Sequence, residues 1–426
     1  MRNKDRYLRF SRIFQKVLAA LAVALATAIT TIGPQPAQAQ TYSVIYNFTG
    51  GSDGEGPDAG LTIDHGGNLY GTSNAGGLGY GTVFKLVHKN STWLFNPLYS
   101  FAGGADGDGT YSRVVFGPDG SLYGVTFGTE GGFGTVFRLQ PPATACKTAL
   151  CPWAETVLYR FTGGSDGANP IGDLTFDQAG NLYGATSAGG YGYGVVYELT
   201  PSNGGWTQSV LHFFERDGDG VFPDAGVIFD KSGNLYGTTA YGSTHGLGVV
   251  YQLTPLGLGW TENVLYDFLG GDDGAVPLGG LILDSAGSLY GTTSGDGTGS
   301  GGTAFELTPQ NGNWNFTLLY SFAGSPGCGP QASLAFDQAG NLYGTTLCDG
   351  MYGQGSVFQL TPSNGSWTYS SLHDFDGSDG AFPVSSLVFD ANGDLYGTAS
   401  EGGAYGYGVV FQITPQAELS GRRRAD

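Results

Sequence analysis

The sequence predicts an all-β fold, a seven-bladed β-propeller with four strands in each blade. The first observation is the tetrapeptide Asn/Ser/Asp-Leu-Tyr-Gly, whose tyrosine recurs at positions 70, 123, 183, 236, 290, 343 and 396, with spacings of 53, 60, 53, 54, 53 and 53 residues. The second is that aromatic residues make up 13% of the chain and recur at fixed repeat positions, whereas no amphipathic helical stretch stands out. The third is that the repeat region begins with one strand of the repeat and lacks that strand at its end.

Each repeat is interpreted as four short strands, A to D, from its alternation and its β-branched and aromatic content. In the fourth repeat we expect these strands at 227–230, 234–239, 248–254 and 260–268. An Asp-x-x-Gly turn from Asp230 to Gly233 joins strands A and B, because Asp and Gly suit tight turns. Pro255 is expected to end strand C, since proline has no amide N–H to donate.

The two ends of the repeat region predict how the ring closes. Residues 42–48 match a D strand, because Ile45-Tyr46-Asn47-Phe48 parallels Leu265-Tyr266-Asp267-Phe268. The last repeat ends with a C strand at 408–414, and no D strand follows it. We therefore expect the N-terminal strand to close the last blade, which removes two exposed sheet edges.

The repeat resembles the bacterial GloVer tandem repeat. The resemblance depends on the Gly-Asn-Leu-Tyr-Gly-Thr-Thr and Gly-Val-Val-Phe-x-Leu-Thr-Pro elements and covers residues 41–415. The arrangement of strands within each repeat is also similar to that of NHL-type propellers. The resemblance implies a bacterial, exported protein and transfers no catalytic residues. Members carry varied C-terminal surface anchors, but here Arg422-Arg423-Arg424 follows no apolar tail, so we expect no sorting signal.

The first residues of the chain have the pattern of an export signal. A basic segment from Arg2 to Lys16 precedes an apolar stretch at 17–31, and Ala37-Gln38-Ala39 supplies a small-residue cleavage site. The apolar run is short for a membrane span. We therefore expect a secreted monomer, extracellular, periplasmic or at the cell surface, without a membrane span in its mature part. The expected divisions are a signal peptide at 1–39, the propeller at 40–415 and a short polar tail at 416–426.

The charge balance excludes one class of partner. Six of the 17 Lys and Arg and one of the 36 Asp and Glu lie in the signal, so the mature chain carries 11 basic and 35 acidic residues, a net charge of −24. Such a surface repels the phosphates of nucleic acids and favours cations. We therefore expect no nucleic-acid partner.

Departures from the repeat point to a ligand site, because a function usually requires broken symmetry. Most repeats carry small residues around the start of strand A, but larger polar ones intrude near one mouth of the channel: Asp58, Tyr111, Arg113, Asp173, Asp224 and Gln331. A small polar ligand could be held there, and an ordinary solvated channel mouth is the alternative. On the same face, the Gly-rich B–C loops carry His245 and aromatics such as Tyr80, Tyr193 and Tyr407, which suit either a binding rim or packing between blades.

The D–A connections repeat Gly-Gly-x-Asp-Gly, which raises the question of calcium. Oxygen ligands suit that ion, and carboxylates gather at Asp106, Asp108, Asp217 and Asp219. The alternative is that each repeated Asp only orders its own turn through hydrogen bonds to the backbone. Calcium is the one cofactor that the sequence suggests.

The sequence favours a binding role over catalysis, and we assign no catalytic residue. It contains no nucleophile elbow, no cluster of metal-binding histidines and no isolated pair of carboxylates. We expect a secreted module that recognises a glycan or a surface protein through the face of D–A and B–C loops. The alternative is a calcium-dependent propeller enzyme of the hydrolase, lyase or lactonase type, with carboxylates at the channel mouth.

The four cysteines are expected to form two disulfides, because export permits oxidation and their number is even. Cys146 and Cys151 lie in the enlarged C–D loop of the second repeat. Cys328 lies in the D–A loop that enters the sixth repeat, and Cys348 lies in the B–C loop of that repeat. Both of the latter loops emerge on one face, so a bond between them is geometrically reasonable.

Overall fold

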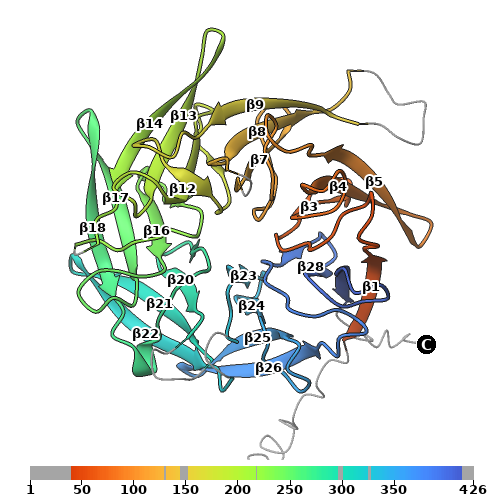
Figure 1. Cartoon of the computed structure of the whole chain (residues 1–426). Coiled ribbons are helices and arrows are strands. Elements are labelled where there is room, and N and C mark those ends of the chain that lie inside the picture. The colour runs from red at the N-terminus through yellow and green to blue at the C-terminus, as the bar shows by residue number, and fades with distance from the viewer. Residues whose placement is uncertain are drawn as a thin grey trace, which may run out of the picture. The chain divides into compact units, whose positions relative to one another are not determined.

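Seven β-sheets succeed one another around a central axis in the residues Tyr42–Thr414 (Figure 1). The computed structural model describes residues 40–128, 131–143, 152–216, 218–295, 301–324 and 328–414. Each sheet is one blade, with strand A innermost and strand D outermost (Figure 1). The predicted seven-bladed propeller is therefore confirmed.

The strands of each blade follow the chain from the axis outward. Blade one contains β2 (Thr62–Ile63), β3 (Leu69–Ser73), β4 (Thr82–Lys89) and β5 (Thr92–Ser100). Blade two contains β6 (Val115–Phe116), β7 (Leu122–Thr126), β8 (Thr135–Gln140) and β9 (Ala154–Arg160). Blade three contains β11 (Thr175–Phe176), β12 (Leu182–Ala188), β13 (Val195–Ser202) and β14 (Gly205–Phe213). Blade four contains β15 (Ile228–Phe229), β16 (Leu235–Thr239), β17 (Val249–Leu256) and β18 (Gly259–Asp267). Blade five contains β19 (Ile282–Leu283), β20 (Leu289–Thr293), β21 (Thr303–Gln310) and β22 (Asn313–Ser321). Blade six contains β23 (Ala335–Phe336), β24 (Leu342–Thr346), β25 (Ser356–Ser363) and β26 (Ser366–Asp374).

Blade seven is closed by the first strand of the chain. Its sheet has the order β1 (Thr41–Asn47), β29 (Val409–Thr414), β28 (Leu395–Ala399) and β27 (Val388–Phe389). The Phe48 amide donates a hydrogen bond to the Gly408 carbonyl at 3.0 Å. The predicted closure by the N-terminal strand is therefore confirmed, and it removes the open edges of the ring.

Two small elements lie outside this pattern. Strand β10 (Ala168–Pro170) pairs with β12, and a short 3₁₀ turn, η1 (Gly271–Asp273), lies in the loop between blades four and five. Among the residues described, no helix is long and apolar enough to cross a membrane.

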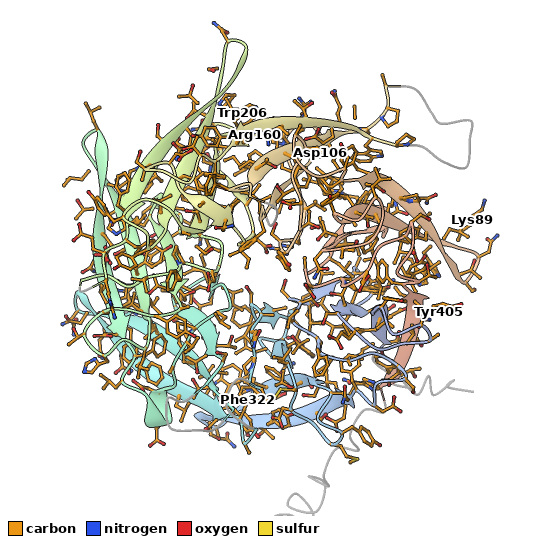
Figure 2. All side chains as sticks on the ribbon, in the orientation of Figure 1. Lys89, Asp106, Arg160, Trp206, Phe322 and Tyr405 are labelled. Carbon is orange, nitrogen blue, oxygen red and sulfur yellow. A yellow bond between two sulfur atoms is a disulfide. The ribbon has the colours of Figure 1, made fainter. Side chains whose placement is uncertain are left out.

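The hydrophobic core lies between neighbouring blades, where large side chains fill the space (Figure 2). Phe322, at the end of a D strand, is fully buried and meets Phe358 of the next blade edge to face, with ring centroids 4.9 Å apart. The same cluster joins Tyr290 of blade five to Leu342 of blade six. Burial of such large aromatic surfaces holds each blade to the next.

The tryptophans that open the D strands also pack between blades. Trp206 meets the repeat tyrosine Tyr123 of the preceding blade, with ring centroids 6.3 Å apart. Trp153 contacts Tyr70 and Trp260 contacts Tyr183 in the same way. These side chains therefore have a structural role at the blade interfaces.

Of the two local predictions for the fourth repeat, the A–B turn is confirmed and the end of strand C is wrong. Asp230 Oδ1 accepts hydrogen bonds from the amides of Ser232 and Asn234, which forms the expected A–B turn. The prediction that Pro255 ends strand C is wrong, because β17 continues to Leu256 and Pro255 pairs with Trp260. The neighbouring β16 reaches only to the level of Leu253, so no ladder bond is lost where proline lacks its N–H.

Candidate functional site

Two positions of each repeat, just before strand A, line one cavity of about 500 Å³ at the end of the channel. The first position holds Asp58, Tyr111, Ile171, Asp224, Leu278, Gln331 and Val384 in blades one to seven. The second, two residues further on, holds Gly60, Arg113, Asp173, Gly226, Gly280, Ser333 and Ser386. The structure therefore brings together Asp58, Tyr111, Arg113, Asp173 and Asp224, and we call this cavity the central hollow.

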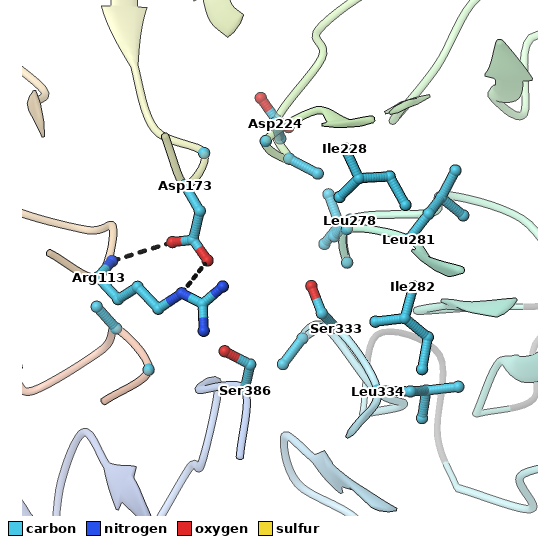
Figure 3. Close-up of a pocket in the computed structure, with 18 of the residues that line it drawn as sticks. Arg113, Asp173, Asp224, Ile228, Leu278, Leu281, Ile282, Ser333, Leu334 and Ser386 are labelled. Carbon is cyan, nitrogen blue, oxygen red and sulfur yellow. Dashed lines mark hydrogen bonds and ion pairs between the residues drawn. The ribbon is translucent and has the colours of Figure 1, made fainter. Parts of the chain in front are cut away.

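An ion pair joins blades two and three inside the central hollow (Figure 3). Arg113 Nε lies 2.7 Å from Asp173 Oδ2, and the Arg113 amide donates a hydrogen bond to Asp173 Oδ1 at 3.1 Å. Among the described residues, no partner is found for the two terminal nitrogens of the guanidinium group. They extend into the hollow, where Ser386 and Ser333 are the next labelled polar side chains (Figure 3). These nitrogens can therefore donate hydrogen bonds to a ligand.

Two further acidic residues, Asp58 and Asp224, line the hollow, and their side chains are partly buried. Burial raises the pKa of Asp58 to about 6, against the opposing effect of a hydrogen bond from the Asn74 amide group, and Glu401 raises it further. Burial also raises the pKa of Asp224 to about 6, and no partner of its carboxyl group is found among the described residues. Both groups can exchange a proton near neutral pH.

The opposite side of the hollow is apolar. Ile228 and Ile282, from the A strands of blades four and five, line it together with Leu278 (Figure 3). Charged groups from blades two and three thus face aliphatic groups from blades four and five. Such a cavity accommodates a ligand with both polar and apolar surfaces.

Tyr111 stands at the rim of the central hollow. Its ring meets Phe127 edge to face, with centroids 5.6 Å apart. Partial burial, with the nearby Asp58 and Asp108 carboxylates, raises the pKa of its hydroxyl. The hydroxyl therefore stays protonated and able to donate a hydrogen bond.

A second cavity, of about 620 Å³, lies beside the first and is lined by the B–C loop of blade four. Its aromatic walls are Tyr193, Phe222 and Tyr241, and Arg216 and His245 add polar groups. His245 Nδ1 lies 3.1 Å from Asp267 Oδ2. We call this cavity the outer hollow. Two of the predicted residues, Tyr193 and His245, line the outer hollow, whereas Arg113 and Asp173 line the central hollow.

Sequence reasoning missed Phe222, Tyr241 and Arg216. The signal that could have found Tyr241 is the B–C loop at 241–246, which departs from the Gly-rich pattern of the other repeats, whereas Arg216 and Phe222 lie in the D–A segment before β15. The structure adds that Tyr241 pairs with Val221 across the loops, so the aromatic side chain is held beside the D–A segment.

Tyr80 and Tyr407 line neither of the two hollows. Each ring lies flat on a glycine of a D–A loop: a Cβ added to Gly103 would come within 2.8 Å of the Tyr80 ring, and one added to Gly50 within 2.7 Å of the Tyr407 ring. Both glycines have positive φ angles, 77° and 73°, which favour glycine independently of this contact. This placement matches the packing alternative for these two tyrosines.

The repeated Asp of the D–A loop accepts hydrogen bonds inside its own turn. Asp106 Oδ2 accepts from the Tyr99 hydroxyl and the Ala102 amide, both at 2.9 Å. Asp219 accepts from the Glu215 amide at 2.8 Å and lies 2.5 Å from His212 Nε2.

The remaining members of the suggested calcium group are placed differently. Asp108 is buried, and Asp217 lies outside the described residues. Within the described ranges, no three His, Cys, Asp or Glu side chains are grouped to hold a metal. Calcium binding stays a prediction.

One of the two expected disulfides is present. Cys328 and Cys348 are bonded, with Cα atoms 4.5 Å apart, and they tie the D–A loop entering blade six to the B–C loop of that blade. Cys146 and Cys151 lie outside the described residues, so their pairing stays a prediction.

Comparisons with solved structures find matches at low sequence identity. A candidate oxidoreductase (glucose dehydrogenase) from Thermus thermophilus is 15% identical with a TM-score of 0.42, and the match covers 88% of this chain and 100% of that one. A candidate gluconolactonase is 13% identical with a TM-score of 0.39, over 79% of this chain and 94% of that one. A comparison with curated proteins found no match.

The comparison with family models shows the family to which the repeat belongs. The family model described as the Gloeobacter/Verrucomicrobia repeat matches residues 30–154, 147–318 and 263–420, which together span nearly the whole chain. This agrees with the resemblance seen in the repeat motifs. The chain belongs to the Gloeobacter/Verrucomicrobia repeat family.

Proposed function

We propose that this chain is an exported binding module that holds the end of a neutral glycan in the central hollow. The observation that carries the proposal is the Arg113–Asp173 ion pair. It is built where the equivalent residues of the other five blades are Gly or Ser. The equivalent positions of the other blades are small and uncharged, so we infer that the charged pair in blades two and three serves to bind a ligand.

A sugar matches the chemistry of this hollow. Vicinal hydroxyl groups can accept from the free guanidinium nitrogens and donate to a neighbouring carboxylate, and the aliphatic wall at Ile228, Leu278 and Ile282 suits the C–H surface of a sugar ring. The net charge of −19 disfavours acidic glycans. A neutral sugar is therefore favoured among glycans.

Export of the protein is part of the same proposal. It is supported by the basic and apolar N-terminal pattern, and a disulfide between Cys328 and Cys348 is compatible with an oxidising compartment. N-terminal sequencing of the protein recovered from the medium and from the periplasm of the producing cells tests this point. Export predicts a mature N-terminus after Ala39, whereas a cytoplasmic protein that begins at Met1 would contradict it.

The binding test uses a glycan array that carries neutral, amino-substituted and uronic-acid sugars. We expect the mature protein to bind neutral glycans and the double variant Arg113→Ala with Asp173→Ala to lose at least about tenfold in affinity. Both partners are removed together so that no unpaired charge is left buried. The matched control is Arg138→Ala with Asp119→Ala, which removes an ion pair of similar length, 2.6 Å, from an A–B turn away from the hollow.

The outcomes of this test separate the candidate partners. Binding that survives the Arg113/Asp173 variant would place the ligand elsewhere and contradict the proposal. An array without any signal, together with capture of a protein partner that depends on Arg113, would replace the glycan by a surface protein.

A hydrolase-type enzyme is a second candidate, because one observation favours it. Asp58 and Asp224, with pKa values raised to about 6, share the hollow with Asp173, and a carboxyl group with such a raised pKa can serve as a general acid in mildly acidic solution. Incubation with glycosides and sugar lactones, with and without calcium, tests this candidate. Turnover that disappears in Asp58→Asn or Asp224→Asn would establish it.

A further inference from the structure

The two hollows lie on either side of one short segment of blade four. Val221 and Phe222 line the outer hollow, whereas Asp224, Ala225 and Gly226 line the central one. A ligand that leaves the central hollow over this segment enters the outer hollow directly. The two cavities can thus serve as neighbouring subsites for one extended molecule.

The outer hollow presents aromatic surface at this crossing. Phe222 and Tyr241 meet edge to face, with ring centroids 6.4 Å apart, and their exposed fractions are 36% and 46%. Exposed rings of this kind suit the apolar face of a sugar ring. Arg216 and the Tyr193 ring at the same cavity add a hydrogen-bond donor and more aromatic surface.

The backbone fixes this aromatic pair in advance. Phe222 has a left-handed φ of 59°, and its amide donates to the Tyr193 carbonyl at 2.9 Å while its carbonyl accepts from the Ala240 amide at 2.9 Å. The left-handed backbone belongs to the repeat, since Asn169 and Val276 have φ angles of 57° and 58° at the equivalent positions of blades three and five. A preorganised platform reduces the entropic cost of binding.

Blade four breaks the symmetry at the position of Tyr241, whereas the position of Phe222 also holds a phenylalanine in blade seven, Phe382, with a φ of 54°. The position of Tyr241 in the loop pairing is held by Ala75 in blade one, Gly295 in blade five and Glu401 in blade seven. In blade three, Ala188 pairs with Ala168 in the same way. In the part of the chain that the structure describes, blade four is where an aromatic residue replaces these residues beside the central hollow.

We infer that the ligand is a linear oligosaccharide whose end lies in the central hollow and whose next units cross 221–226 into the outer hollow. This inference rests on the proposed function, and it adds the direction in which the bound glycan runs and the minimum length that the glycan must have. Charge supports the same class of ligand as before, because a neutral chain avoids repulsion by the acidic surface.

The variants that test this inference copy residues from other blades, so we expect the fold to tolerate them. Phe222→Asn introduces the residue that blade three holds at the same left-handed position, and Tyr241→Ala introduces the residue of blades one and three. Tyr405→Ala is the matched control, because Tyr405 is 62% exposed on a B–C loop of blade seven and lines neither hollow.

The probes are length series of the neutral glycans on the array, from the monosaccharide to long oligomers, followed by calorimetric titration. We expect affinity to rise with chain length, and we expect the Phe222→Asn/Tyr241→Ala variant to lose about tenfold for long oligomers while it binds the monosaccharide normally. Tyr405→Ala should behave as the unaltered protein does.

Two outcomes would overturn the inference, and they are distinguishable from failure of the proposed function. Affinity that is independent of chain length in the unaltered protein contradicts it, as does an equal loss in the blade-four variant for short and long glycans. If short glycans bind and depend on Arg113, the proposed function stands and only the oligosaccharide path fails. If no neutral glycan binds at any length, both fail.

Discussion

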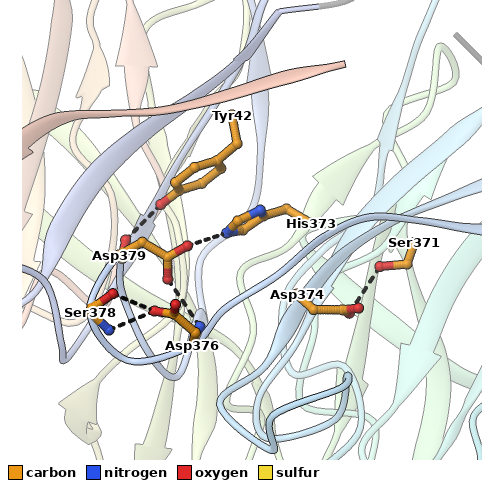
Figure 4. Close-up of polar contacts among 7 residues, drawn as sticks. All are labelled: Tyr42, Ser371, His373, Asp374, Asp376, Ser378 and Asp379. Carbon is orange, nitrogen blue, oxygen red and sulfur yellow. Dashed lines mark hydrogen bonds and ion pairs between the residues drawn. The ribbon is translucent and has the colours of Figure 1, made fainter. Parts of the chain in front are cut away.

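Tyr42, in the first strand of the propeller, stacks on His373 of blade six, with ring centroids 3.6 Å apart and planes within 5° of parallel (Figure 4). The Tyr42 hydroxyl donates a hydrogen bond to the Asp379 carbonyl at 2.7 Å, and His373 Nε2 lies 2.8 Å from the Asp379 carboxylate. The closing strand is therefore held both to its own sheet and to the loop that enters blade seven. Related stacks occur elsewhere, as between Tyr46 and Phe95.

The closing strand is expected to stabilise the whole ring. Tyr42→Ala removes the stack and the hydrogen bond and should lower the free energy of unfolding by about 2 kcal/mol, and deletion of residues 40–48 should cost more because blade seven loses its outer strand. Urea unfolding measures both effects. Tyr405→Ala, on an exposed ring, is the control and should change little. A deletion variant with unaltered unfolding would contradict closure.

His373 is expected to make stability depend on pH in the mildly acidic range. Burial lowers its pKa below the ordinary value of 6.5, although the Asp379 carboxylate opposes this, and Asp374 and Asp376 oppose it further. The unfolded chain therefore takes up a proton first as pH falls, so stability is lost from about pH 6.5 downward, until the folded protein is also protonated. Above that range the group has no effect.

The variant His373→Tyr tests this prediction, because tyrosine occupies the equivalent position in other blades, as at Tyr46 and Tyr99. Its free energy of unfolding should fall less than that of the unaltered protein between about pH 7.5 and pH 5.5. Parallel pH profiles for the two proteins would show that His373 does not contribute.

Asp58 is expected to reduce stability at neutral pH, which is typical of groups retained for binding. Its folded pKa of about 6 lies above the ordinary value of 3.8, so its stabilising contribution is complete below about pH 4 and is lost as pH rises through 6. Asp58→Asn should therefore be more stable than the unaltered protein by about 2 kcal/mol at pH 8, less than a full shift implies because some solvent reaches the side chain.

The difference should shrink as pH falls and vanish below about pH 3, where Asp58 is protonated in both the folded and the unfolded state. Asp64→Asn is a control of opposite sign, since, against the effect of burial, hydrogen bonds from the side chain and the amide of Asn68 hold the pKa of Asp64 low. Chemical denaturation over this pH range measures both variants. An Asp58→Asn variant that is less stable at pH 8 would contradict the prediction.

The disulfide is expected to stabilise blade six. Replacement of Cys328 and Cys348 by alanine opens a loop with a sequence separation of 20 and should cost about 3 kcal/mol. Peptide mapping without reductant should recover the 328–348 link, and we expect a second link between Cys146 and Cys151. Cross-pairing between these two groups would contradict the strand register on which both assignments depend.

The sequence by itself determined the blade count, the turn positions and the closing strand. These features follow from local chemistry, because alternation, Asp-Gly turns and the spacing of Tyr70 and its equivalents repeat in every blade. The same local reasoning correctly predicted the A–B turn that begins at Asp230. It failed at Pro255, since the length of the neighbouring strand, not the proline alone, decides where strand C ends.

Only the tertiary structure decided which departures from the repeat share a cavity. Arg113 and Asp173 are 60 residues apart in the chain and are brought into contact because successive blades place equivalent positions side by side around the axis. The same geometry unites Tyr193, Phe222 and Tyr241 at blade four, whereas it lays Tyr80 and Tyr407 on glycines between blades. The physical reason is that a repeat specifies each blade through local contacts, but the cavities form between blades, where residues distant in sequence meet.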